Sequence, residues 1–172
     1  NFDQLIYTPH ESYLNPMKMV AGLIKIFQNL GGKILFSTCI THWEDSGHQV
    51  SVTLEENLKF NCSKLIFAVN GFAPQLLPQL EVQSARNQIL MLKPEIPLKL
   101  KGCFHYHKGY VYFRNVGDSL LIGGGRHLDT AGENTLDWDF NTTITNYLID
   151  FAEKHLLQNV AYKVTDHWTG IL

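Results

Sequence analysis

The sequence predicts a mixed α/β chain: a helix and a largely parallel sheet come first, and an antiparallel or mixed sheet with one helix follows. Three observations support this prediction. Apolar residues recur at helical spacing after Asn15, residues 64–69 are apolar without alternation, and several short alternating segments separated by turn residues follow Pro78. An apolar run without alternation is typical of a strand that is covered on both faces.

The first half begins with a predicted helix. Asn15 has the residue type of an N-cap, Pro16 suits the first turn, and Gly31-Gly32 ends the pattern. The apolar positions of this helix are Val20, Leu23, Ile24, Phe27 and Leu30. Strands are expected at 33–38 and 48–54, with a return strand carrying Leu58 and Phe60, and the buried strand is expected at 64–69. These elements predict a parallel-sheet domain whose crossover includes a β-meander.

The second half reads as an antiparallel sheet with a helix. Strands are predicted at residues 82–92, 102–107, 110–114, 119–122 and 160–168. A helix is expected to begin near Asn141 and to bury Ile144, Leu148 and Phe151.

Composition excludes several classes of protein. The 172 residues are 45% hydrophobic and 17% charged, with a net charge of −2, so neither nucleic acid nor an anionic membrane is an expected partner. Apolar runs are too short for a transmembrane segment, and the three cysteines lack metal or redox spacing. We expect a soluble, cytoplasmic protein with reduced cysteines. The start without methionine and the end within an apolar segment suggest a fragment.

Two glycine-containing segments are candidate sites. Asn70-Gly71 follows the predicted buried strand, where open α/β sheets bind ligands, although the local sequence alone favours a simple turn. Gly123-Gly124-Gly125 resembles a phosphate loop but is not followed by a helix start. These glycines instead indicate a strand that leaves space for a flat ring or another backbone.

The polar candidates are mostly aromatic or histidine residues. His105 and His107 alternate on one predicted strand face, but no further zinc ligand has a recognisable spacing, so no metal site is predicted. A Ser-His-Asp site is excluded because the chain has no GxSxG. Tyr110, Tyr112 and Arg114 alternate on the next strand, where they either pack across the sheet or hold a small substrate.

Six segments together resemble the FAD-dependent D-amino-acid-oxidase-like family, which includes glycine oxidase, sarcosine oxidase and gamma-glutamylputrescine oxidoreductase. They occur in the family's order: Asn15-Pro16 with its helix, Gly31-Gly32-Lys33-Ile34, residues 67–74 (FAVNGFAP), Arg86-Asn87-Gln88, residues 109–114 with 120–124, and residues 167–172 (HWTGIL). The resemblance implies that residues 1–80 are the middle of an FAD-binding, Rossmann-like domain. Residues 81–172 would then belong to the substrate-binding domain.

The resemblance also assigns roles to individual residues. Cofactor contacts are implied for Ile40, Asn70, Gly71, Phe72, Trp168 and Gly170. A catalytic role is implied for His127, with Tyr110 and Tyr112 on the substrate side, and we expect the three side chains to face one shared cleft. The activity implied is oxidation of an amine or amino acid by hydride transfer to the flavin, with oxygen or a carrier as the electron acceptor.

The sequence departs from the family pattern in two respects, which affect cofactor binding and the expected substrate. The family's GxGxxG and its carboxyl-terminal glycine-rich segment are not in the sequence, so FAD should bind this fragment weakly or not at all. An arginine that clamps the substrate carboxylate usually follows the Trp-x-Gly glycine after one residue, but Leu172 stands there. This predicts a substrate amine without an adjacent carboxylate, unless Arg114 or Arg126 replaces the clamp. The alternative function is a non-catalytic binding or assembly module on the same fold.

Overall fold

The computed structural model describes residues 5–172, apart from the side chain of residue 56. Residues 14–68 form one compact unit, and the chain up to Tyr13 forms a second unit together with Val69–Leu172. The predicted domain division at residue 80 concerns the domains of the family and stays a prediction. Each unit is described separately below.

The unit of residues 14–68 begins with helix α1, Pro16–Asn29. Its start is the predicted one, because the Asn15 side chain accepts a hydrogen bond from the backbone N–H of Lys18 at 3.0 Å. Leu30 is the C-cap of the helix, and Gly31 follows in the left-handed conformation with φ +89°. No residue of α1 is buried. The capping residue and the helical spacing of the sequence therefore define this helix, and no other element of the unit packs over its apolar face.

A three-stranded antiparallel sheet follows in the order β1-β2-β3, which confirms the predicted β-meander. The strands are β1 Ile40–Asp45, β2 Val50–Leu54 and β3 Lys59–Cys62, with a 3-10 turn, Glu55–Asn57, between the last two. Alternate residues of β2 form a small core, because one face of this strand packs inward. These residues are Val50, Val52 and Leu54.

Two strands predicted in this unit are wrong. Residues 33–38 and 64–69 form no strand. The apolar composition favours an extended chain, but a strand also needs a neighbour whose backbone groups complete its hydrogen bonds. No described strand pairs with either segment. Ile66, expected to be covered on both faces, is 84% exposed.

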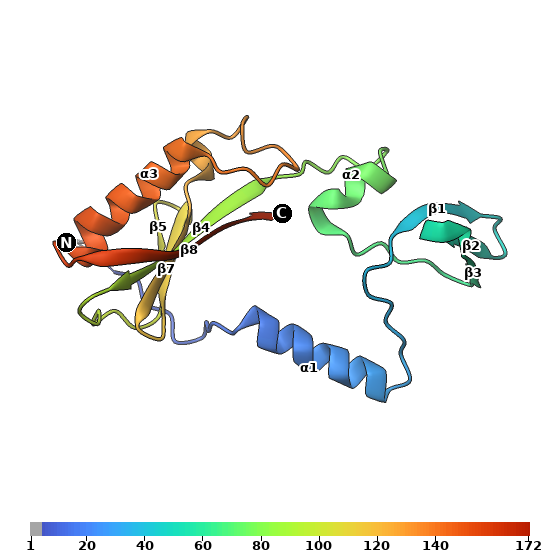
Figure 1. Ribbon diagram of the computed structural model, residues 1–172, viewed down its shortest axis with the longest axis horizontal. Coiled ribbons are helices and arrows are strands. Elements are labelled where there is room, and N and C mark those ends of the chain that lie inside the picture. The colour runs from blue at the N-terminus through green and yellow to red at the C-terminus, as the bar shows by residue number, and fades with distance from the viewer. Residues whose placement is uncertain (1–4) are drawn as a thin grey trace. The chain divides into compact units, whose positions relative to one another are not determined.

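The second unit contains a five-stranded, fully antiparallel sheet in the order β5-β6-β7-β4-β8, which confirms the predicted antiparallel sheet with a helix. Its strands are β4 Arg86–Pro94, β5 Cys103–Tyr106, β6 Val111–Val116, β7 Ser119–Gly124 and β8 Tyr162–Ile171. The helical segments are the 3-10 turn η2 Asn70–Phe72, α2 Ala73–Leu76, the 3-10 turn η3 Arg126–Leu128, α3 Thr142–Phe151 and the π-helix η4 Ala152–Leu157. Helix α3 lies along one face of the sheet (Figure 1).

Helix α3 confirms the sequence-based prediction in detail. The Asn141 side chain accepts hydrogen bonds from the N–H groups of Thr143 and Ile144, and the predicted residues Ile144, Leu148 and Phe151 are buried. They pack against alternate residues of four strands, and we call this side of the sheet the helix face. Its main strand residues are Leu90, Leu92, Phe104, Val111, Phe113, Leu120 and Ile122.

Alternation places the intervening residues on the other side, which we call the open face. Register assigns its members, because directly paired residues project to the same side of a sheet. The open face includes Asn87, Ile89, Tyr112, Gly123, Trp168 and Gly170. No helix in the described part of the chain is long and apolar enough to cross a membrane.

Candidate functional site

Tyr112 lies on the open face, where its ring crosses strand β7 to reach β4. The crossing is possible because Gly123 has no side chain: a Cβ there would lie 2.6 Å from the Tyr112 hydroxyl oxygen. At the far end of the ring, the Asn87 side-chain N–H donates a hydrogen bond to that oxygen at 3.1 Å. Burial raises the pKa of the Tyr112 phenol, and the hydrogen bond from Asn87 opposes part of this rise.

The remaining glycines of this run allow close approach of the main chain. At Gly124, φ is +109° and an added Cβ would collide with the Tyr110 carbonyl oxygen. The Gly125 N–H donates a hydrogen bond to the same oxygen at 2.7 Å. The sequence indicated space for a flat ring or another backbone, and the structure contains both: the ring of Tyr112 and the backbone of Tyr110.

Tyr110 and His127 are brought together by the ends of β7 and of the β5–β6 hairpin. Their ring centroids are 4.4 Å apart, and His127 also meets His107 at 5.0 Å and Tyr147 of α3 at 5.9 Å. The Nδ1 atom of His127 is buried without a hydrogen-bond partner. Burial, and then the nearby His107, lower the pKa of His127, so its imidazole is neutral at neutral pH.

These positions separate residues that the sequence placed together. Tyr112 projects from the open face, whereas His127 packs against Tyr147 on the helix face. The three predicted catalytic residues therefore do not line one shared cleft, although Tyr110 and His127 are in contact.

The predicted shared strand face of His105 and His107 is also wrong. Strand β5 ends at Tyr106, and His107 lies in the following turn with φ +50°. Its ring accordingly turns toward His127, while His105 lies across from Tyr112. Among the described residues, no three potential metal ligands of the His, Cys, Asp or Glu type lie close enough together to hold an ion.

Most of the predicted cofactor residues gather near the end of β8. Asn70, Gly71 and Phe72 form the turn η2, and a Cβ at Gly71 would collide with the Leu172 carbonyl oxygen. In this unit, Gly71 thus allows a close approach of the chain to itself. Trp168 and Gly170 lie on β8, and Gly170 pairs directly with Asn87. Ile40 is the first residue of β1 in the other unit.

Arg86, the first residue of the Arg-x-Gln segment, forms a buried ion pair with Glu133. The guanidinium donates two hydrogen bonds to the carboxylate, at 2.7 and 3.2 Å, and Glu133 is fully buried. The hydrogen bonds to Glu133 raise the pKa of Arg86. Asn141, the N-cap of α3, donates to Glu133 at 3.1 Å and to Asp129 at 2.8 Å. This network joins β4, the turn after His127 and the start of α3.

Gln88 extends the network on the helix face. Its side-chain oxygen accepts from the Asn141 N–H and the Thr145 hydroxyl, and its N–H donates to the Asn141 carbonyl. Sequence reasoning found Arg86 and Gln88 by resemblance but missed Asn87, Glu133 and Asn141 as partners. Alternation along β4 was the available signal for Asn87, since it places this residue on the face of the sheet opposite its two neighbours.

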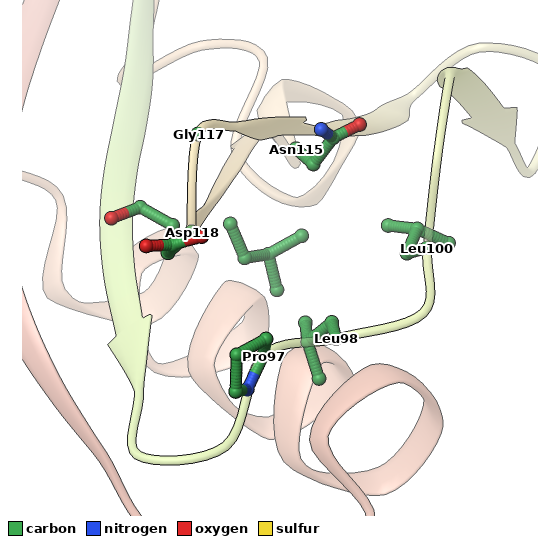
Figure 2. Close-up of a pocket in the computed structure, with 8 residues that line it drawn as sticks. Pro97, Leu98, Leu100, Asn115, Gly117 and Asp118 are labelled. Atoms are coloured by element: carbon green, nitrogen blue, oxygen red, sulfur yellow. The ribbon is translucent and has the colours of Figure 1, made fainter.

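A hollow beside the β6–β7 turn is too small for a substrate. It lies between the loop of Pro97, Leu98 and Leu100 and the turn at Gly117 and Asp118 (Figure 2). Its volume of ≈ 30 Å³ suits water, whereas ligand sites are an order of magnitude larger.

The mixed α/β fold and the aromatic, glycine-bordered open face are compatible with a cofactor-dependent oxidoreductase, and comparison with known proteins identifies the class. The profile of the FAD dependent oxidoreductase (DAO) family matches residues 1–172, and the chain belongs to this family. No curated protein sequence matches the chain.

Solved structures share the fold. Glycine oxidase from Geobacillus kaustophilus is similar with a TM-score of 0.69 and 16% identity, over 89% of this chain and 40% of that one. L-Proline dehydrogenase from P. horikoshii has a TM-score of 0.66 and 12% identity, over 91% and 43%. Glycine oxidase from Bacillus cereus has a TM-score of 0.61 and 14% identity, over 82% and 39%. The chain thus spans about two fifths of the length of these proteins.

Residues of the open face fit a flat cofactor. A Cβ added at Gly170 would have no atom within 4 Å, and the neighbouring Trp168 is 39% exposed. A planar ring system can therefore approach the backbone at Gly170 and contact the indole.

Proposed function

We propose that this chain is part of an enzyme that uses FAD to oxidise a small amine or amino acid. The observation that carries the proposal is the match of the FAD-dependent oxidoreductase family over all 172 residues. Similar folds in two glycine oxidases and an L-proline dehydrogenase support it, since their names describe oxidation of amino acids. The electron acceptor is either oxygen or a carrier.

When bound, FAD supplies the acceptor for a hydride from the carbon that carries the amine. The substrate must also lose a proton from nitrogen, and a substrate that arrives as an ammonium ion must lose one before it reacts. The neutral His127 is the proposed proton acceptor, with Tyr110 packed against its ring. A lowered pKa suits this role, because the imidazole is not already protonated at neutral pH.

Trp168, Gly170 and Tyr112 are the proposed binding residues on the open face. Gly170 leaves room for the cofactor and Trp168 offers an apolar surface. Tyr112 would orient the substrate and help to exclude water. Asn70, Gly71 and Phe72 near the end of β8, and Ile40 on β1, are the remaining proposed cofactor contacts.

The proposed substrate is an amine without an adjacent carboxylate. A buried carboxylate requires a cation, and the arginine that the family resemblance implies after the Trp-x-Gly segment is replaced by Leu172. Arg114 is engaged elsewhere: its guanidinium carbon lies 5.2 Å from the centre of the Tyr13 ring. Arg126 donates a hydrogen bond to Asn134 at 3.0 Å.

The test uses the full-length protein. It should purify with FAD, absorbing near ~450 nm, and should reduce its flavin anaerobically with amines more readily than with α-amino acids. His127→Asn should slow flavin reduction at neutral pH, whereas the exposed His10→Asn should not. A flavin that no amine or amino acid reduces would refute the proposal and favour a non-catalytic module. A preference for α-amino acids that Arg114→Ala abolishes would show that a carboxylate clamp exists.

A further inference from the structure

The hairpin turn between β5 and β6 directs His107 toward His127. Three consecutive residues, His107, Lys108 and Gly109, are left-handed, with φ values of +50°, +58° and +88°. The Tyr110 N–H donates a hydrogen bond to the His107 carbonyl at 3.1 Å, which closes the turn. Because β5 ends before His107, its side chain leaves the alternation of that strand. Its ring instead meets the ring of His127 edge to face, with 5.0 Å between the centroids.

The groups that face His127 do not compensate a positive charge on its ring. Its rings in contact are those of His107 and Tyr110 from the hairpin and of Tyr147 from α3. On its own turn, the preceding residue Arg126 is cationic. None of these groups is an anion at neutral pH, and the buried Nδ1 of His127 has no hydrogen-bond partner among the described residues. An added proton on His127 is therefore unfavourable.

His107 differs from His127 in its exposure to solvent. His107 is exposed, so water can solvate its protonated form, whereas the ring of His127 is partly desolvated. A proton shared by the two rings is therefore better placed on His107, and its charge then repels a second proton from His127. The lowered pKa of His127, caused first by burial and then by His107, agrees with this order.

We propose that His107 is a positioning residue that keeps the imidazole of His127 neutral, and so able to accept a proton, when the solution becomes mildly acidic. The inference rests on the proposed function only for the use of that imidazole, which is proton uptake from the substrate amine. As the pH falls, His107 binds a proton from the solvent and delays protonation of His127. The site then retains its proton acceptor at lower pH than burial alone would allow.

The first measurement follows His127 in the full-length protein through the ¹³Cε1 resonance of labelled histidine, with His127→Asn to assign the signal. His107→Phe is the decisive variant, because it keeps an aromatic ring beside His127 but carries no charge. The titration midpoint of His127 should rise by about half a unit, which raises its protonated fraction about threefold above the midpoint. Salt at about 1 M should raise the midpoint in the wild-type protein but much less in His107→Phe, because salt screens the exposed charge.

His105→Phe is the matched control. His105 is an exposed histidine of the same hairpin, but its ring lies toward Tyr112, with 6.5 Å between the centroids. This control should leave the His127 titration unchanged. An unchanged midpoint in His107→Phe overturns the proposal, since the ring of residue 107 would then act by packing alone. If that variant does not fold, His107→Asn decides, because asparagine tolerates the left-handed backbone. A salt dependence of the His127 midpoint that persists in His107→Asn refutes the role of the charge.

The second measurement separates this interaction from the proposed function. In the full-length enzyme at saturating amine, the limiting rate of anaerobic flavin reduction should decline at acidic pH as His127 becomes protonated. His107→Phe should move this decline to higher pH by the same amount as the titration midpoint, which a purely structural role of His107 would not do. An unmoved decline together with a shifted titration would uphold the interaction between the two histidines and refute only His127 as the proton acceptor.

Discussion

Replacing Glu133 by Gln is expected to destabilise the unit that contains the five-stranded sheet strongly. Glu133 is 0% and Arg86 6% exposed, and the two hydrogen bonds between them are 2.7 and 3.2 Å long. The glutamine keeps the shape of the side chain but removes the hydrogen-bonded counter-charge of the buried guanidinium, so that only the weaker attraction of Asp137 and Asp139 remains. Removal of one partner of such a pair costs roughly 3–5 kcal/mol, because the desolvated charge loses its main compensation.

The assay is urea unfolding monitored by tryptophan fluorescence in a Trp43→Phe background. The fluorescence then comes only from Trp138 and Trp168, which lie in this unit, and reports its unfolding. Asp150→Asn is the control. Asp150 pairs with Lys154 at 2.6 Å, but this pair is on the surface, and its removal should cause no measurable change.

A double variant separates the charge from the packing. Arg86→Met with Glu133→Leu removes both charges and should regain most of the lost stability, as replacements of buried ion pairs by apolar residues often do. The reasoning is refuted if Glu133→Gln lowers the free energy of unfolding by less than about 1 kcal/mol, since an uncompensated buried charge cannot cost so little.

Three further outcomes are expected. Gly71→Ala should destabilise the same unit by about 1–3 kcal/mol, because the added Cβ collides with the Leu172 carbonyl; Gly22→Ala in α1 meets nothing within 4 Å and should stabilise its helix. Burial, then the hydrogen bond and charge of Glu153, raise the pKa of Tyr162 to about 12, so this group stabilises the fold below its unfolded pKa of about 10 and the contribution is lost as pH rises toward about 12. A Tyr162→Phe variant should lack that part of the alkaline decline in unfolding free energy, and an unchanged decline contradicts the interpretation. Purified residues 1–172 should be colourless and should not saturate with FAD at micromolar concentrations; FAD that purifies with the fragment at one per chain would contradict this.

Elements defined by local chemistry were predictable from the sequence. Helix α3 begins at the predicted cap, Asn141, and buries the three predicted residues, because capping and amphipathic spacing act within a few residues. The hairpin turns around Gly109 and Gly117 fall where positive φ values are required. The resulting antiparallel sheet follows from these turns and from alternation.

Elements that depend on distant partners were not predictable. Residues 64–69 have the composition of a buried strand, yet composition does not specify which strand supplies the hydrogen-bonding neighbour. Similarly, alternation suggested a common face for His105 and His107, but the chain turns at His107 into a left-handed conformation. The side of the sheet on which a residue lies follows from alternation only while the strand continues.

The glycine run at 123–125 explains why the candidate site could be recognised in part. Each glycine is needed for a different reason. Gly123 leaves room for the Tyr112 ring, and Gly124 allows the close approach of the Tyr110 carbonyl. Gly125 adopts the left-handed conformation at the start of the turn that carries His127. The run therefore positions all three predicted catalytic residues, although it directs Tyr112 to the open face and His127 to the helix face. The motif indicated which residues gather at this end of the sheet. Their division between the two faces depends on the register of β6 with β7, which pairs Tyr112 with Gly123. Tyr112, one of the proposed binding residues, therefore lies on the open face, and the proposed proton-accepting role of His127 requires the substrate amine to reach the end of β7.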